Sequence, residues 1–313
     1  MKRRDLLKNA AALGCMAAIP LSSFGQLATA STSDATRPAA EPTSLKPPAE
    51  GSIPVAFVIS DGAVMIDFAG PWEVFQDTYI HGAMGQGMRM DLFRLYTVAE
   101  TDKPIEASGG MKIIPDYTFA TAPAPRVIVI PGQSAQEKPS QAMQEWIRKS
   151  AKNADVTMSV CTGAFLLANT GLLQGKAATT NHNAYKSMAM QFPDITLKRG
   201  ARFVEQGNIA TAGGLSAGID LALRVVERYY GQDIAKQTAY EMEYQGQGWL
   251  NPGSNEVYAK ARVSTDAHPL CAVCDMDVDR ATAPRSVYKG KTYYFCMTDH
   301  KQLFDAAPEK YQS

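Results

Sequence analysis

A cysteine stands where an apolar strand is expected to turn into a helix. Val156–Val160 has the pattern of a short buried strand, and Cys161, Thr162 and Gly163 follow it, before a helix expected over 164–169. On such a turn the side chain is exposed at the carboxyl edge of the sheet, beside a helix N-terminus whose amides lower a thiol's pKa. The pattern therefore predicts a reactive thiolate at Cys161. The alternative is a buried, inert cysteine, which is the commoner environment of this residue.

A nucleophilic cysteine needs an acid or base nearby and N–H donors for the negative charge that develops on its substrate. Asp67 precedes a helix expected over 71–79, where it can cap the helix, act as the acid, or do both. Gly132 follows an apolar strand, and we expect its loop to approach the substrate with free backbone N–H groups, unless it is simply a turn glycine. Glu73 is expected to be a solvated helix carboxylate.

A second group of cysteines lies near the C-terminus. Cys271 and Cys274 form a C-x2-C pair, and Cys296 and His300 form a Cys-x3-His pair, which together give four ligands at the spacing of metal sites. A module of fewer than about 50 residues has too little core to fold unaided, so a metal would stabilise it. The donor set favours copper, as Cu(I), or zinc. Disulfides among the three cysteines are the alternative, and His268 is a weaker ligand candidate.

The elements that must position these residues alternate between strands and helices. Near-continuous apolar strands separated by helices are typical of a parallel sheet covered on both faces, which places this part of the chain in the α/β class. Near the C-terminus the pattern predicts a hairpin with a turn at Gly290 and a helix over 298–306. In the α/β part we expect strands over 54–59, 90–98, 126–130, 156–160 and 209–212, and helices over 71–79, 141–154, 164–169, 183–191 and 216–230.

Composition excludes two classes of partner. The chain has 313 residues, a formal net charge of +0 and 20% charged residues, with no basic patch of the kind that binds nucleic acid. No apolar run approaches the roughly 20 residues that span a bilayer. We therefore expect neither a nucleic-acid partner nor a membrane span, and a small-molecule substrate and a metal ion remain as partners.

The first residues have the pattern of an export signal. Arg3 and Arg4 lead into a weakly apolar stretch that ends in a small-x-small cleavage site at Ala30. This order resembles the twin-arginine signal and predicts a periplasmic protein, in a compartment where paired cysteines tend to form disulfides. The predicted divisions are a signal peptide over 1–30, a flexible linker over 31–50, an α/β domain over 51–249, a linker over 250–265 and a metal-binding module over 266–313.

Five motifs of the α/β part occur in the order found in the ThiJ/PfpI family, which it resembles from residue 53 to about residue 244. The resemblance implies a flavodoxin-like three-layer sandwich with a mostly parallel sheet, a dimer, and a cysteine in the nucleophile position. In peptidase-like members a histidine follows that cysteine, whereas Thr162 follows it here, and His182 lies one position beyond the histidine of many relatives. Peptidase activity is therefore not expected. The motifs are residues 67–73, 129–132, 159–163, 171–175 and 211–220.

Asp67, Cys161 and Thr162 together resemble the isonitrile hydratase-like branch and the sensor domains of related transcription regulators. The resemblance to the hydratase branch implies a cysteine-dependent carbon–nitrogen lyase. Such an enzyme converts an isonitrile and water to an N-substituted formamide without a cofactor in the α/β domain. A glyoxalase- or deglycase-like use of the same thiol is a weaker alternative.

The C-terminal module resembles the YHS domain, a small metal-binding module. Cys274, Cys296 and His300 fall at the ligand positions of that family, with His300 standing where a second cysteine is usual and Cys271 as an addition. This resemblance leaves a second class of function open, in which the chain is a periplasmic metal-binding stress or sensor protein and not an enzyme.

Overall fold

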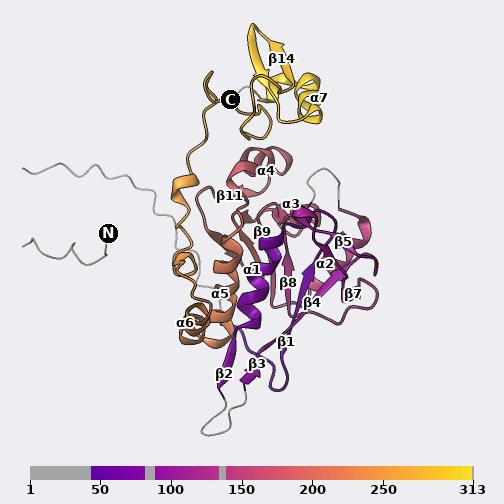
Figure 1. Ribbon diagram of the computed structural model, residues 1–313, viewed down its shortest axis with the longest axis vertical. Helices are drawn as coiled ribbons and strands as arrows, with labels where there is room; N and C mark the ends of the chain where they lie inside the picture. The colour runs from indigo at the N-terminus through magenta and orange to yellow at the C-terminus, as the bar shows by residue number, and fades with distance from the viewer. Residues whose placement is uncertain (1–43, 82–88, 134–138, 312–313) are drawn as a thin grey trace, which may run out of the picture. The chain divides into compact units, whose positions relative to one another are not determined.

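The computed structural model describes residues 44–81, 89–133 and 139–311 (Figure 1). The predicted export signal over 1–30 lies outside the described residues. Among the helices that the structure describes, none is both long and apolar enough to cross a membrane. The described chain begins beside the α/β domain, because the Leu45 N–H donates to Arg228 O at 2.7 Å.

A seven-stranded sheet forms the centre of the α/β domain, in the order β12-β13-β9-β8-β1-β4-β7. Neighbouring strands are parallel except β12 and β13, which are antiparallel. The mostly parallel α/β sheet predicted from the sequence is therefore confirmed. Its strands are β1 (Ile53–Val58), β4 (Phe93–Ala99), β7 (Tyr117–Thr118), β8 (Val127–Ile130), β9 (Val156–Val160), β12 (Phe203–Gln206) and β13 (Ile209–Ala212).

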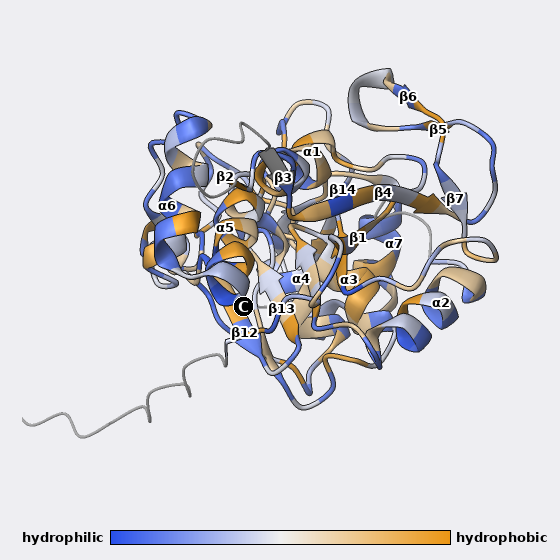
Figure 2. Ribbon diagram, turned by 90° about the horizontal axis from the view of Figure 1, so that it is seen from below, coloured by the Kyte–Doolittle hydropathy of each residue, from blue (hydrophilic) through white to orange (hydrophobic). Residues whose placement is uncertain are grey.

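Helices cover both faces of this sheet because its strands are apolar on both sides. In β1, Val55 and Phe57 enter one core, and Ala56 and Val58 enter the other. Figure 2 shows hydrophilic outer turns on α2 and α6, away from the apolar strands. One face carries α1 (Met65–Gln76), α5 (Ala217–Tyr230) and α6 (Gln232–Glu241), and the other carries α2 (Gln141–Ala151), α3 (Gly163–Asn169) and α4 (Tyr185–Gln191).

The start of α1 differs from the prediction. The helix begins at Met65 and contains Pro71, which the sequence pattern places at the helix start. Figure 1 shows α1 and α5 side by side. They cross closely, because a Cβ added to Gly70 would lie 2.8 Å from Ile219 and one added to Gly218 would lie 3.3 Å from Pro71. The earlier start is what brings Asp67 into the helix.

Short elements complete the α/β domain. The predicted strand over 90–98 is two strands, since β3 pairs with β2 before β4 begins, and α6 was not predicted. The short strands are β2 (Tyr79–His81), β3 (Arg89–Asp91), β5 (Ile105–Glu106), β6 (Lys112–Ile113), β10 (Ala177–Ala178) and β11 (Thr196–Leu197). Short 3-10 helices span Ser108–Gly110, His182–Ala184, Gly248–Leu250 and Glu256–Tyr258.

The C-terminal module has its own small core. A hairpin of β14 (Arg285–Tyr288) and β15 (Lys291–Tyr294) is followed by α7 (Thr298–Ala306) and a 3-10 helix, Pro308–Tyr311. The hairpin and the helix are confirmed as predicted, with both turn residues at positive φ (Lys289 49°, Gly290 76°). The buried members of the core are Cys271, Val273, Cys274, Phe295, Phe304 and Tyr311.

Candidate thiol site and metal centre

Cys161 occupies a strained turn between β9 and α3. Its φ is 57°, in the left-handed region that non-glycine residues rarely adopt. The Cys161 N–H donates to Gly213 O at 2.9 Å, and the Thr180 hydroxyl donates to Cys161 O at 2.8 Å. A Cβ on Gly163 would collide with Ile130 O, so only glycine allows the chain to turn this sharply. The predicted strand–cysteine–helix elbow is confirmed.

The environment of the Cys161 thiol opposes ionisation. Its side chain is 6% exposed, and burial followed by the nearby Asp67 charge raises the pKa of the thiol to about 11. The backbone N–H groups of Thr162 and Leu215 and the side chain of Asn181 favour the thiolate, but they offset only part of that rise. The prediction of a lowered pKa is therefore wrong, because burial outweighs the local amides. At neutral pH the thiol keeps its proton.

Asp67 is a buried carboxyl beside this thiol. Its Oδ2 accepts the Gly132 N–H at 2.9 Å, while Oδ1 has no hydrogen-bond donor among the described residues. Burial raises the pKa of Asp67 to about 7, although the Gly132 amide and the Cys161 thiol favour the charged form. The N-cap of α1 is Val64, so the capping interpretation of Asp67 is wrong. The carboxyl can gain or lose a proton near neutral pH.

Gly132 lies against two other predicted site residues, Asp67 and Thr162. A Cβ added to it would lie 2.7 Å from Thr162 Oγ1 and 2.8 Å from Asp67 Oδ2, so the close approach requires glycine. Its N–H is used by Asp67 and is not free for a substrate. The backbone donors that face the thiol are instead those of Thr162 and Leu215.

Two residues that face the thiol were not predicted. Leu215 follows Gly213-Gly214 and has a φ of 51°. The sequence pattern that could have indicated it is a strand followed by two glycines and then a helix. Asn181 lies against Gly214 and had no such signal. His182 stacks its ring on Tyr258, at 4.5 Å between centroids and 25° between planes.

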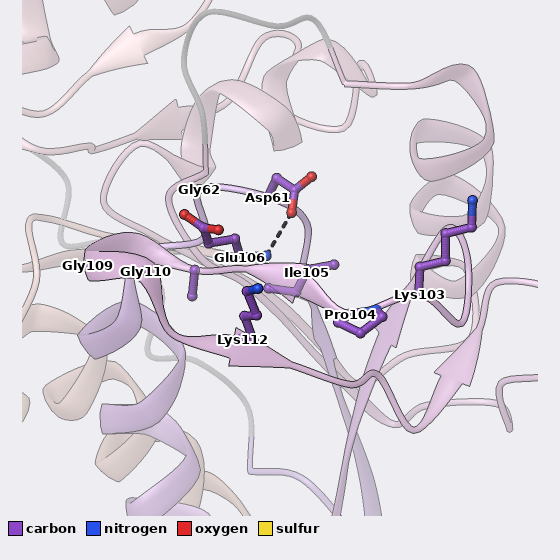
Figure 3. Close-up of a pocket in the computed structure, with 10 residues that line it drawn as sticks. Asp61, Gly62, Lys103, Pro104, Ile105, Glu106, Gly109, Gly110 and Lys112 are labelled. Carbon is purple, nitrogen blue, oxygen red and sulfur yellow. Dashed lines mark hydrogen bonds between the residues drawn. The ribbon is translucent and has the colours of Figure 1, made fainter.

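A separate open depression of about 840 Å³ lies along the β5–β6 hairpin (Figure 3). Asp61, Glu106, Lys103 and Lys112 give it charges of both signs, and the Glu106 N–H donates to Asp61 Oδ1 at 2.8 Å. None of the predicted thiol-site residues lines it. The adjoining Ser108 accepts the Met65 N–H at 3.0 Å, so this hairpin fixes the start of α1.

The structure brings the four predicted metal ligands together. The ligand atoms of Cys271, Cys274, Cys296 and His300 all lie within 4.8 Å of one another. The Cys274 and Cys296 sulfurs are 3.5 Å apart, and His300 Nδ1 lies 3.4 Å from Cys271 Sγ and 3.2 Å from Cys296 Sγ. A tetrahedral ion with Zn–S bonds of about 2.3 Å needs sulfurs about 3.8 Å apart, so the cluster fits such an ion. His268 is exposed and outside the cluster.

The cluster lowers the pKa of one of its thiols and holds no disulfide. All four described cysteines are free thiols, and a disulfide would need sulfurs about 2.0 Å apart. A hydrogen bond from the Cys274 thiol lowers the pKa of Cys271 to about 3, and the pKa of Cys274 rises in return. The turn between them is held by the Asp275 N–H, which donates to Cys271 O at 2.9 Å. Metal binding needs deprotonated thiols, and this cluster favours that form at Cys271, while burial and the neighbouring Cys271 raise the pKa of Cys296 as well.

Comparisons with known proteins cover both parts of the chain. The DJ-1/PfpI family model matches residues 54–228, and the YHS domain model matches residues 272–313. Isonitrile hydratase of Pseudomonas putida is 30% identical over 214 residues, which are 68% of this chain and 87% of that protein. The HTH-type transcriptional regulator CdhR of Pseudomonas aeruginosa is 28% identical over 150 residues, 48% of this chain and 44% of the regulator.

Solved structures agree with these matches. A ThiJ/PfpI family protein from Pseudomonas syringae superposes with a TM-score of 0.54 at 26% identity, covering 65% of this chain and 80% of that one. Drosophila melanogaster DJ-1beta superposes with a TM-score of 0.53 at 18% identity, covering 63% of this chain and 100% of that one, and shows the fold alone.

Proposed function

Because this chain belongs to the DJ-1/PfpI family and ends in a YHS domain, we propose that its α/β domain is an isonitrile hydratase-like enzyme with Cys161 as nucleophile. The observation that carries the proposal is the Asp67 carboxyl, whose pKa of about 7 and position beside the thiol suit it to proton transfer. Thr162 Oγ1 and Asp67 Oδ2 both lie close to Gly132. This is the trio that the sequence associates with the hydratase branch.

The reaction follows from that placement. The Asp67 carboxylate takes the thiol proton as Cys161 sulfur attacks the terminal carbon of the isonitrile, and then gives this proton to the same carbon. The product is a thioimidate, Cys161–S–CH=N–R. Water adds to its carbon, the C–S bond breaks, the thiol regains a proton, and the formimidic acid rearranges to the N-substituted formamide. The Thr162 hydroxyl would orient the carboxyl or the water, a role supported by its position near Gly132, which Asp67 Oδ2 also approaches.

The buried thiol also suits the substrate. The reacting end of an isonitrile is linear and narrow, so it can reach a side chain that is only 6% exposed. Leu215, whose N–H faces the sulfur, and Ile66, next to Asp67, leave their side chains 46% and 41% exposed. These apolar side chains would contact the organic substituent of an isonitrile. The Thr162 and Leu215 amides would stabilise negative charge on the sulfur when the thiolate is the leaving group.

We further propose that the YHS domain binds one copper or zinc ion through Cys271, Cys274, Cys296 and His300. The ion would stabilise the small module and bring Lewis-acid or redox chemistry, depending on the metal. No step of the proposed hydration needs it. Export to the periplasm and assembly as a homodimer are parts of the proposal that rest on the sequence and family patterns.

A second candidate function is metal binding without catalysis, as a stress or sensor protein. The free three-thiol, one-imidazole cluster favours it, and so does the similarity of the α/β domain to a transcription regulator. In that case Cys161 would be a ligand-sensing or structural residue.

Turnover separates the two candidates. Purified full-length protein is incubated with small alkyl and aryl isonitriles, and formamide is followed by chromatography and NMR. We expect turnover in the wild type and none in Cys161→Ala, with the fold of the variant checked by circular dichroism. Absence of formamide from every isonitrile in a folded, reduced wild type would overturn the enzyme proposal and favour the metal-binding one.

A further inference from the structure

The segment 251–259, which leads from the α/β domain toward the YHS domain, packs on the α/β domain; we call it the linker segment. The Arg202 N–H donates to Pro252 O at 2.6 Å, and a Cβ on Gly200 would lie 2.8 Å from Ala259 Cβ. Asn255, a polar side chain on this segment, is only 8% exposed. The linker segment is therefore seated by specific contacts.

Those contacts fall on the two loops that face the Cys161 thiol. Asn255 Nδ2 lies 3.0 Å from the position that a Cβ on Gly213 would take, and Gly213 O accepts the Cys161 N–H. The Tyr258 ring stacks on His182, and the residue before His182 is Asn181, which faces the thiol. One segment thus touches both loops, each within two residues of a donor to the sulfur.

Arg202 ties the linker segment to the loop over residues 213–216. Its carbonyl accepts the Gly213 N–H at 2.9 Å, and its guanidinium donates to Ser216 Oγ at 2.9 Å. The same guanidinium donates to Asp220 Oδ2 at 2.5 Å and to Asn255 Oδ1 at 3.3 Å. The loop that presents the Leu215 N–H to the sulfur is therefore held at both ends by one residue, and Asn255 is a partner of that residue.

We propose that the linker segment is a functional part of the thiol site, in which Asn255 and Tyr258 are positioning residues for the groups that contact Cys161 sulfur. The physical reason is that Leu215 has a φ of 51°, a conformation that persists only where its surroundings fix it. Hydrogen bonds weaken steeply as their geometry is lost, so loosening either loop would weaken stabilisation of the thiolate. This inference does not rest on the reaction proposed above, because it concerns the thiol itself.

The test measures the rate at which iodoacetamide alkylates Cys161 in the full-length protein between pH 6 and pH 11, with the modified peptide identified by mass spectrometry. Asp67 is the ionisable group whose charge acts on this thiol, and it is unchanged in every variant. We expect Asn255→Ala and Tyr258→Ala to raise the apparent pKa of Cys161 and to slow alkylation at pH 8 about fivefold. Tyr258→Phe should restore wild-type behaviour, because it keeps the stacked ring.

Val257→Ala is the matched control, since Val257 lies in the same segment and is 80% exposed. Tryptophan fluorescence shows whether each variant keeps its α/β fold. If Asn255→Ala fails to fold, the Tyr258 pair carries the test alone, because Tyr258 is 45% exposed and its ring lies at the surface. An unchanged or lowered pKa in the folded alanine variants would overturn the proposal, as would an equal effect of Val257→Ala.

Discussion

The two cysteine sites of this chain use the same functional group in opposite ways. At the thiol site, burial and a neighbouring carboxyl raise the pKa of Cys161 to about 11, so the sulfur keeps its proton. In the YHS domain, a neighbouring thiol and His300 lower the pKa of Cys271, so this thiol gives up its proton, while the pKa of Cys274 and of Cys296 rises. The residue type is identical, and the neighbouring groups decide whether its thiol keeps its proton or gives it up.

The two sites also differ in what holds them. Cys161 is fixed by backbone contacts between β9, α3 and the 213–216 loop inside a large core. The four predicted YHS ligands lie in a module whose buried core has six of the described residues, so an ion bound there would provide much of its stability. Changes at the thiol site should therefore alter the α/β domain alone, whereas loss of a ligand should unfold the module.

The largest effect is expected from His300→Ala. Loss of one of four ligands should weaken zinc binding by more than about 100-fold and unfold the YHS module, because the remaining thiols no longer close a tetrahedral site. Zinc affinity is measured in reduced, oxygen-free full-length protein by competition with a chromophoric chelator. His268→Ala is the matched control, since His268 is exposed and outside the cluster. Equal zinc affinity in the two variants would contradict the ligand assignment.

Gly163→Ala tests the scaffold of the thiol site. The added Cβ would collide with Ile130 O, a backbone atom of the central sheet that cannot rotate away. We expect the α/β domain to lose about 4 kcal/mol of stability, measured by urea unfolding. All three tryptophans, Trp72, Trp146 and Trp249, lie in this domain, so their fluorescence reports on it alone. Gly253→Ala should change the unfolding midpoint little, because the added Cβ would lie at ordinary contact distance, 3.4 Å, from Asn251 Oδ1.

Asp67 should make the stability of the α/β domain fall as the pH rises. Its pKa is about 7 in the folded chain against 3.8 for the free group, so the folded state holds a proton that the unfolded state releases. The stabilisation is complete below pH 3.8 and is lost as the pH rises through 7. Between pH 5 and pH 8 the loss is about 3 kcal/mol, at about 1.4 kcal/mol per pH unit.

The measurement for this prediction is urea unfolding, followed by tryptophan fluorescence at both pH values. Asp67→Asn should remove the pH dependence that Asp67 contributes, while Glu73→Gln, an exposed carboxylate on the same helix, should keep it. A wild type and an Asp67→Asn variant with the same pH dependence would show that the carboxyl titrates normally.

The contrast between the sites also explains what the sequence could predict. The four predicted metal ligands lie within one short module, so their spacing along the chain was enough to predict that they meet. They are Cys271, Cys274, Cys296 and His300. The bounds of β9 and α7 were predictable because their patterns are local.

The thiol site is different because it is assembled from distant segments. The elbow at Cys161 was predictable, but the direction of its pKa depends on burial, which is a property of the whole core. Asn181 and Leu215 face the sulfur because the order of strands in the sheet brings their segments beside Cys161. The spacing of these residues along the chain does not reveal this neighbourhood. The start of α1 was misplaced because Pro71 is tolerated inside the helix, where it packs near Gly218 of α5.

The smallest effect is expected from Asp67→Asn on the reactivity of Cys161. The negative charge of Asp67 helps to raise the pKa of the thiol, so replacing the carboxylate with a neutral amide of similar size should lower that pKa. Alkylation by iodoacetamide at pH 9 should then be about tenfold faster, which corresponds to one pKa unit. Glu73→Gln should leave the rate unchanged.

Formamide production should fall in Asp67→Asn, because an amide cannot carry the proton between thiol and substrate. Faster alkylation of Cys161 together with slower formamide production would separate the two roles of Asp67. One role is the negative charge that keeps the thiol protonated, and the other is transfer of the thiol proton to the substrate. If both rates rose together, Asp67 would act on Cys161 only through its charge.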